Sequence, residues 1–322
     1  MTREDSEHRV VAITGASGYI GSEVLALLES MDFRLIDLRR SWMPQLCPDN
    51  VSRLEFDLLG DSPWKQVPIE EIDYIVHLAA IDLTSEYNPF EDVRVNAISV
   101  LSLLENVAVR NPNVKIIYAS SSNVYGYTDG RIVNESDPVL PLSLWSTHKY
   151  LAESYIRIYQ TTHSIRSIIL RLPNVYGVGS GQGSGLLAER SALNRAIRSC
   201  LDSGRLSLFS NRDCFRDYLH VKDVSSAIVE AIGQFSSLFE KQVLNIGFQS
   251  SRTIRETWEI VAEYCAEKTG GVPQILTLDR AMSPFELRSF RLDGSCFVKS
   301  TGWKPEFTIQ QGVKFTVDSF SS

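Results

Sequence analysis

An apolar run that leads directly into three regularly spaced glycines is the feature that most constrains this chain. Residues 10–21 read VVAITGASGYIG. The run suits a parallel strand covered on both faces. Gly15 allows a sharp turn, Gly18 removes a Cβ where a pyrophosphate would approach, and Gly21 lets the following helix pack closely. The start of that helix attracts phosphate, so the spacing favours a dinucleotide site over an ordinary turn before a helix.

A carboxylate further along the chain bears on how an adenosine ribose would be held. A second strand-like run ends in Asp37, 22 residues after Gly15. An acidic side chain near this offset can bind the ribose hydroxyls of NAD and would repel the 2′-phosphate of NADP. Arg39 and Arg40 follow directly and could receive that phosphate. We therefore expect NAD as the cofactor and keep NADP as the alternative.

The composition excludes several classes of protein. With 43% hydrophobic and 22% charged residues, the 322-residue chain is ordinary for a globular protein, and its net charge of −7 argues against binding nucleic acid or a membrane surface. The five cysteines are widely spaced and include no CxxC pair, which indicates neither a disulfide framework nor a metal site. Without an 18-residue apolar span or an apolar leader, we expect a cytoplasmic protein.

Strand-like and helix-like segments alternate over the first half of the chain. Segments 88–110 and 146–161 have helical periodicity. The strand-like runs are Val10–Ile13, Phe33–Ile36, Tyr74–Leu78, Val114–Tyr118 and Ser167–Leu172. This alternation predicts an α/β fold with a Rossmann-type, doubly wound parallel sheet.

The pattern changes after the glycine-rich stretch 177–185, which either borders a substrate site or forms a mobile surface loop. We predict a dinucleotide-binding domain over 1–175 and a smaller, mixed C-terminal substrate-binding lobe over 176–322. The chain is expected to cross between the two.

Short segments spread over nearly the whole chain resemble one family. They are TGASGYIG (14–21), Asp37, the Asp57-Leu58 pair, HLAA (77–80), Asn96, YASSSNVYG (118–126), Lys149 in HKYLAE, RLPNVYG (171–177), RDYLHVKDV (216–224) and TGWKP (301–305). Their order and intervals resemble the extended short-chain dehydrogenase/reductases, particularly the NAD-dependent sugar-nucleotide epimerases and dehydratases. The resemblance implies a nucleotide-sugar substrate and a homodimer that packs through the helices at 88–110 and 146–161.

The resemblance also implies which residues bind the cofactor. Asp57 and Leu58 would lie beside the adenine, Asn96 would lie near the active site, and Lys149 would bond the nicotinamide ribose and lower the pKa of a nearby phenol. The expected cofactor-binding residues are Gly15, Ser17, Gly18, Tyr19, Ile20, Gly21, Asp37, Arg39, Asp57, Leu58, Leu78, Ala79, Ala80, Asn96, Lys149 and Pro173. Core packing is the alternative reading of the alanines.

A second set of residues is expected to bind the substrate. Ser121 falls where the family has the Ser or Thr that bonds the substrate hydroxyl or carbonyl, and Ser122 follows it. Arg216 and Arg288 match arginines that hold the nucleotide diphosphate, for which positively charged, bidentate guanidinium groups are suited. Asn174 would contact the same diphosphate or hold its loop.

The chain departs from the family at the acid–base residue. The family has a tyrosine four residues before the lysine, whereas this chain has Trp145. An indole N–H donates a hydrogen bond but cannot act as a base near neutral pH. His148 is a candidate substitute because imidazole titrates near pH 7, although one helical residue separates it by about 100° from Lys149. A surface or supporting histidine is the alternative.

Two functions remain open after this departure. The first is an NAD-dependent sugar-nucleotide epimerase, dehydrogenase or ketoreductase with an altered proton-transfer site, in which Ser121 and Lys149 act. The second is a non-catalytic or regulatory protein that binds the dinucleotide or a nucleotide sugar. Dehydration across the sugar C5 and C6 atoms is not expected, because Ser122 and Asn123 replace the acidic pair that the dehydratases of the family carry.

Overall fold

A seven-stranded sheet forms the centre of the protein in the computed structural model, which describes residues 9–40, 48–60, 62–81, 88–179, 188, 191–248 and 251–321. Its strand order is β12-β7-β5-β4-β1-β2-β3, and every neighbouring pair is parallel. The strands are β1 (Arg9–Thr14), β2 (Phe33–Arg39), β3 (Val51–Glu55), β4 (Tyr74–His77), β5 (Lys115–Ser121), β7 (Arg166–Leu172) and β12 (Val243–Asn245). The predicted Rossmann-type fold class is confirmed.

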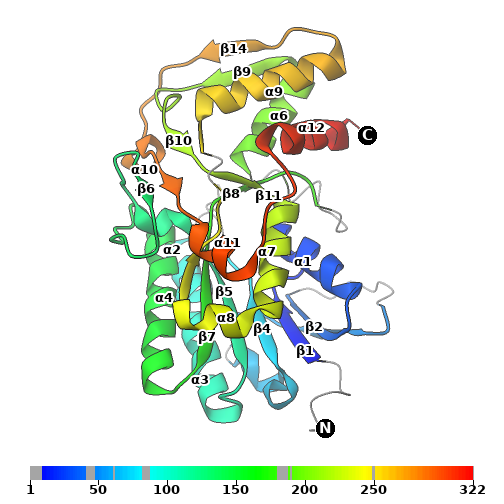
Figure 1. Cartoon of the computed structure of the whole chain (residues 1–322), viewed down its shortest axis with the longest axis vertical. Helices are drawn as coiled ribbons and strands as arrows, with labels where there is room; N and C mark the ends of the chain where they lie inside the picture. The colour runs from blue at the N-terminus through cyan, green and yellow to red at the C-terminus, as the bar shows by residue number, and fades with distance from the viewer. Residues whose placement is uncertain are drawn as a thin grey trace.

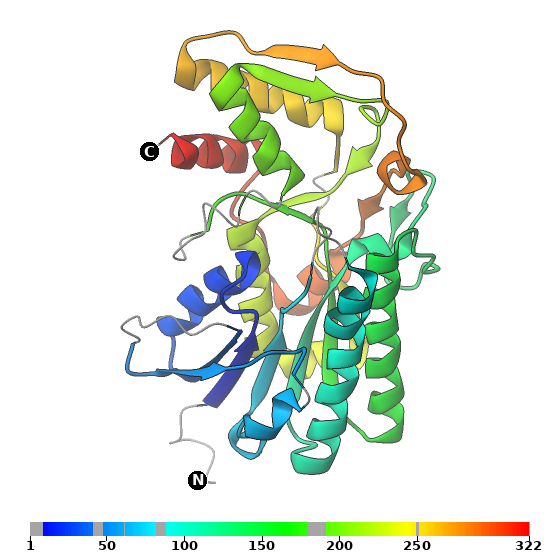
Figure 2. The ribbon, with the colours of Figure 1, turned by 180° about the vertical axis from the view of Figure 1, so that it is seen from behind.

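Helices cover both faces of this sheet. In Figure 1, α7 (Val221–Gly233) and α11 (Ser295–Thr301) lie in front of the strands, near α1 (Tyr19–Glu29). Figure 2 shows α3 (Ser99–Arg110) and α4 (Leu144–Thr162) in front of the opposite face. Alternate residues of β1 enter the two cores: Val11 and Ile13 pack on one side, Val10 and Ala12 on the other. This double burial explains why the strand is apolar without a gap.

The predicted helix over 88–110 consists of three segments. They are α2 (Pro89–Val93), a π-helical segment η3 (Arg94–Ile98) and α3. Asn88 begins α2 by accepting hydrogen bonds from the backbone N–H groups of Phe90 and Glu91. The first turn of α4 is fixed by a reciprocal capping box between Ser143 and Ser146.

The chain after residue 176 contributes to two regions. Its outer part packs around a third apolar cluster and contains α6 (Ala192–Ser203), β9 (Arg205–Leu208), α9 (Ile254–Thr269), β14 (Gln274–Thr277) and α12 (Ile309–Phe320). These elements lie above the sheet in Figure 1. In contrast, α7 packs against α1 and β12 pairs with β7, so the chain returns to the central sheet. The domain boundary at residue 175 stays a prediction.

The remaining elements are short and connect these layers. They are η1 (Pro63–Gln66), η2 (Ile69–Glu71), η4 (Ser122–Tyr125), β6 (Ile132–Val133), β8 (Asn174–Tyr176), β10 (Phe215–Arg216), β11 (Tyr218–His220), α8 (Phe235–Leu238), η5 (Phe239–Lys241), β13 (Arg252–Thr253), α10 (Pro284–Leu287) and β15 (Arg291–Leu292). Among the described helices, none combines the length and the apolarity needed to cross a membrane.

Candidate functional site

A cavity of about 1150 Å³ runs along the carboxyl ends of the parallel strands and into the C-terminal lobe. Ligands of open parallel sheets gather at this edge. The predicted site residues that line it are Gly15, Ser17, Gly18, Tyr19, Ile20, Gly21, Arg39, Asp57, Leu58, Leu78, Ala79, Ala80, Ser121, Trp145, Lys149, Pro173, Asn174, Arg216 and Arg288. Four others do not line it: Asp37, Asn96, Ser122 and His148. The fold thus brings most of the sequence motifs to one continuous cavity.

The glycine loop forms one end of the cavity, and its geometry requires glycine. Gly15 has a φ of +72°, and a Cβ there would lie 2.7 Å from the backbone nitrogen of Ala79. A Cβ on Gly21 would lie 2.0 Å from the carbonyl oxygen of Gly15. Gly18 begins α1 without a side-chain cap, and the first turn of that helix has no acidic residue. Its N–H groups and dipole are therefore available to an anion, which fits the phosphates of a dinucleotide.

The adenosine end of the cavity differs from the sequence prediction. The side chain of Asp37 is fully buried. Its carboxylate pairs with Arg39 and lies 3.4 Å from the Nε atom of Arg53. The surface presented to a ligand there includes Arg39 and Arg40 together with Asp57. In this arrangement Asp37 meets arginines rather than the cavity.

Ser121 and Lys149 both line the cavity. Ser121 ends β5, and its Oγ atom accepts a hydrogen bond of 3.2 Å from the backbone N–H of Asn123. The Nζ atom of Lys149 donates to the carbonyl oxygen of Ala119 at 2.9 Å. Burial and the charge of this ammonium lower the pKa of the neighbouring His77 to about 3. The lining of the cavity therefore includes a hydroxyl and a buried ammonium.

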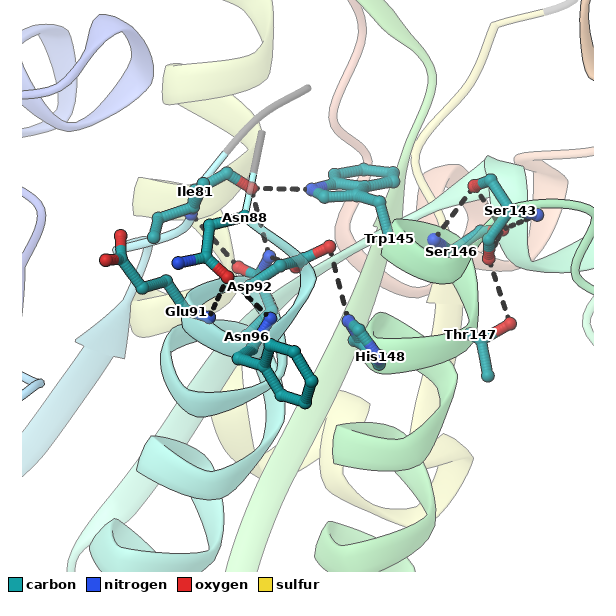
Figure 3. Close-up of polar contacts among 11 residues, drawn as sticks. Ile81, Asn88, Glu91, Asp92, Asn96, Ser143, Trp145, Ser146, Thr147 and His148 are labelled. Carbon is teal, nitrogen blue, oxygen red and sulfur yellow. Dashed lines mark hydrogen bonds and ion pairs between the residues drawn. The ribbon is translucent and has the colours of Figure 1, made fainter. Parts of the chain in front are cut away.

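Trp145 forms the wall next to these two groups, and its N–H is already engaged. Its Nε1 atom donates to the carbonyl oxygen of Ile81 at 2.8 Å (Figure 3). Asn96 bonds both backbone groups of Ile81, donating from Nδ2 at 3.0 Å and accepting at Oδ1 at 3.1 Å. Asn96 thus holds the chain after β4 instead of lining the cavity.

His148 also lies away from the cavity. Its Nδ1 atom is 3.2 Å from the Oδ2 atom of Asp92, a fully buried carboxylate of α2 (Figure 3). Asn96 donates to the other oxygen of the same carboxylate. The histidine therefore faces a buried acid rather than a substrate position, which is the rotation that the helical spacing from Lys149 predicts.

Two arginines form the far part of the cavity. Arg216 donates to the carbonyl oxygens of Phe215, Glu286 and Arg288. Arg288 is 3% exposed, and burial together with the charge of Arg216 lowers its pKa to about 9. Among the described residues, neither guanidinium has a carboxylate partner, so their charges favour an anionic ligand.

The substrate side differs from the prediction at Ser122. Ser122 is buried in η4, and the cavity is lined instead by the next residue, Asn123, which accepts a hydrogen bond from Arg288. Asn174 donates from Nδ2 to the carbonyl oxygen of Asp217 at 3.0 Å, which holds β8 beside β11. Other lining residues carry no motif that the sequence analysis could have used: Ile81, Arg195, Phe209, Trp258 and Arg280.

A comparison with protein families decides the relationship. The model of the NAD-dependent epimerase/dehydratase family matches residues 11–247. The chain belongs to this family. The resemblance found in the sequence motifs is thereby confirmed, and so is NAD, the cofactor on which the family depends.

Individual members of the epimerase/dehydratase family are distant from this chain but match it over nearly its whole length. GDP-6-deoxy-D-mannose reductase of Pseudomonas aeruginosa is 26% identical, covering 96% of each chain. UDP-glucose 4-epimerase of Azospirillum brasilense is 25% identical and covers 97% of this chain and 92% of its own length. The crystal structure of UDP-glucuronic acid 4-epimerase from Bacillus cereus has a TM-score of 0.80 at 22% identity, with 97% and 98% of the two chains covered.

Three tyrosines that are near Ser121 or Lys149 in the sequence do not line the described part of the cavity. The hydroxyl of Tyr125 donates to Asn245, Tyr127 is 59% exposed, and Tyr150 is also outside the lining. Of the described lining residues from β4, β5, η4 and α4, only Lys149 carries an amine, carboxyl, imidazole or phenol. No group of three or more metal-ligating side chains occurs within the described ranges.

Proposed function

We propose that this chain is an NAD-dependent enzyme that acts on a nucleotide sugar, with proton transfer carried by groups other than a tyrosine. One observation carries the proposal: a single cavity joins the glycine loop, the Ser121–Lys149 pair and the two arginines without carboxylate partners. The order of these groups corresponds to a dinucleotide, a reacting sugar carbon and a nucleotide diphosphate.

The glycine loop would hold the pyrophosphate of the cofactor on the free N–H groups of α1, and Lys149 would hold its nicotinamide ribose. When bound, NAD supplies a hydride acceptor and NADH supplies a hydride donor. The protein's part is to place the sugar, to exclude water and to handle the proton of the reacting oxygen.

Ser121 and Lys149 are suited to donate that proton rather than to remove it. The hydroxyl of Ser121 can hydrogen-bond a substrate oxygen, and the ammonium of Lys149 stabilises negative charge that develops there. Trp145 cannot act as a base, and its N–H is bonded to Ile81. We therefore propose that the substrate enters with a carbonyl at the reacting carbon. The reductase activity named for the Pseudomonas relative supports this direction.

A binding protein without turnover is the second candidate, and one observation favours it. Trp145, which stands four residues before Lys149 where the resemblance implies a tyrosine, lines the cavity with its only N–H already bonded to the backbone. Loss of an acid–base group with retention of the ligand cavity is one route by which fold and catalysis separate.

Turnover assays distinguish the two candidates. The purified protein would be incubated with NADH or NAD and a panel of UDP-, GDP- and dTDP-sugars and their 4-keto forms, while nicotinamide absorbance and product mass are followed. For an enzyme, Ser121→Ala and Lys149→Ala are each expected to lower kcat by about 10²- to 10⁴-fold. Ser154→Ala is the matched control, because its hydroxyl lies on α4 and donates to the carbonyl of Tyr150. Saturable NADH binding without turnover of any sugar would support the binding protein.

We further propose that the enzyme acts in the cytoplasm as a homodimer. The cysteines at 200, 214, 265 and 296 are free thiols, as expected in a reducing compartment. Four exposed apolar side chains on α2, η3 and α4 support self-association through these helices: Phe90, Ile98, Leu144 and Ile158.

A further inference from the structure

We infer that His148 is a positioning residue, which acts through Asp92 and Asn96 to hold the backbone of Ile81 and thereby the indole of Trp145. Trp145 and His148 lie three residues apart on α4, and both contact the chain segments opposite that helix (Figure 3). Successive polar contacts link the side chain of His148 to the side chain of Trp145. The inference concerns the wall of the cavity and does not depend on turnover.

The first of these contacts involves the buried carboxylate of Asp92. The carboxylate of Asp92 is fully buried, and burial of an ionised group is costly unless it is paired and hydrogen-bonded. His148 faces its Oδ2 atom at 3.2 Å, and Asn96 donates to its Oδ1 atom. The imidazole of His148 therefore lies at ion-pair distance from one carboxylate oxygen, while Asn96 bonds the other.

Asn96 links the carboxylate of Asp92 to the backbone of Ile81, which follows β4. An amide side chain has one oxygen acceptor and one NH2 group. The NH2 group serves Asp92 and the carbonyl oxygen of Ile81, which leaves the amide oxygen for the N–H of Ile81. Rotation of the amide by 180° would oppose its oxygen to the carboxylate. Asp92 thus selects one of two amide orientations, and that orientation fixes Ile81.

Ile81 connects Asn96 to Trp145. Its carbonyl oxygen accepts from Asn96 at 3.0 Å and from Trp145 at 2.8 Å, which occupies both lone pairs. The indole lines the cavity, whereas Asn96 and His148 do not. A change at His148 is therefore expected to reach the cavity through the ion-pair contact with Asp92 and the hydrogen bonds of Asn96 and Trp145.

The experiment observes the indole N–H of Trp145 directly. Protein labelled with ¹⁵N would be examined by two-dimensional NMR without cofactor or substrate, and Trp145→Phe would identify one indole signal among those of the five tryptophans. His148→Ala is expected to displace that signal and to speed its hydrogen exchange by about two- to tenfold, the range that loss of one hydrogen bond gives. His148→Asn, whose polar amide can lie against the same carboxylate oxygen, is expected to restore both values.

Controls separate this link from a general loosening of α4. Thr147→Ala removes a neighbouring hydroxyl that bonds only the carbonyl of Ser143 among the contacts of Figure 3, and the Trp145 signal should not move. If His148→Ala fails to fold, His148→Gln provides the same test, because its amide lies beyond the Nδ1 position. An unchanged Trp145 signal in the folded alanine or glutamine variant would overturn the inference, as would an equal displacement by Thr147→Ala. Either result leaves the proposed enzymatic function untouched.

Discussion

Arg39 pairs with Asp37 at the adenosine end of the cavity, and the arginine lines the cavity while the carboxylate is fully buried. Asp37 is held from its other side by Arg53. The charge of the acid that would repel a 2′-phosphate is therefore compensated, and the arginine that would attract one lines the cavity. We therefore expect the choice between NAD and NADP to depend on this pair.

We expect Arg39→Ala to change the preference between NADH and NADPH. Loss of one charge-assisted contact should lower the affinity for NADPH relative to NADH by about ten- to a hundredfold. Calorimetric titration with each cofactor gives the ratio. Arg34→Ala is the control, because Arg34 lies on the same strand and pairs with Glu71 at the surface. An unchanged ratio in Arg39→Ala would show that Asp37 alone governs the choice.

Arg288 is expected to make nucleotide binding depend on pH. Its pKa is lowered to about 9 by burial and by Arg216, so the charge that attracts a diphosphate is present below pH 9 and is lost above it. The affinity for UDP should therefore fall as the pH rises through about 9, and Arg288→Ala should remove this dependence. Arg205→Ala, an exposed substitution in the same lobe, should retain it. A flat profile in the unmodified protein would contradict the prediction.

Glu153→Gln is expected to destabilise the protein strongly. Glu153 forms two hydrogen bonds with Arg171, at 3.0 and 2.6 Å, and both side chains are fully buried. Removal of one charge leaves the other buried without compensation, at a cost of about 3–5 kcal/mol. Denaturant unfolding followed by circular dichroism gives the change. Glu105→Gln on the neighbouring helix α3 should have little effect, because that side chain is exposed.

Ile98→Asp and Ile158→Asp are expected to shift the protein from dimer to monomer. Both side chains are about half exposed, at 45% and 53%, on the helices proposed as the interface. A buried carboxylate at the centre of an apolar contact is costly, so each variant should sediment as a monomer. Analytical ultracentrifugation measures this, with Val272→Asp as a control on the distant C-terminal lobe. An unmodified protein that is monomeric at high concentration would refute the proposed assembly.

The strands and the glycine loop could be predicted because their residues carry local signals. The periodicity of apolar residues, the apolar runs and the glycine spacing can each be recognised from residues close together in the sequence. β3 was missed because Val51–Glu55 reads as a polar sequence. That strand places Arg53 directly opposite Asp37, which is why the burial of the predicted ribose ligand could not be foreseen.

At the centre of the site, the sequence indicated the side chains that lie in motifs but not the contacts between distant segments. Ser121, Trp145 and Lys149 lie in recognisable motifs, and all three line the cavity. Ile81 acts through its backbone oxygen, which no side-chain pattern reveals. The partner of His148 belongs to a different helix, so spacing within α4 could exclude the cavity face but could not identify Asp92.

The return of the chain to the sheet has a consequence for folding. β12 forms the edge of the sheet beside β7, and α7 covers α1, although both elements follow residue 176. A truncated chain that ends at residue 175 would contain β1, β4 and β5 but would lack α7, the helix that covers one of their faces. Such a fragment is expected to aggregate, because the apolar surface that α7 covers in the intact chain would be exposed.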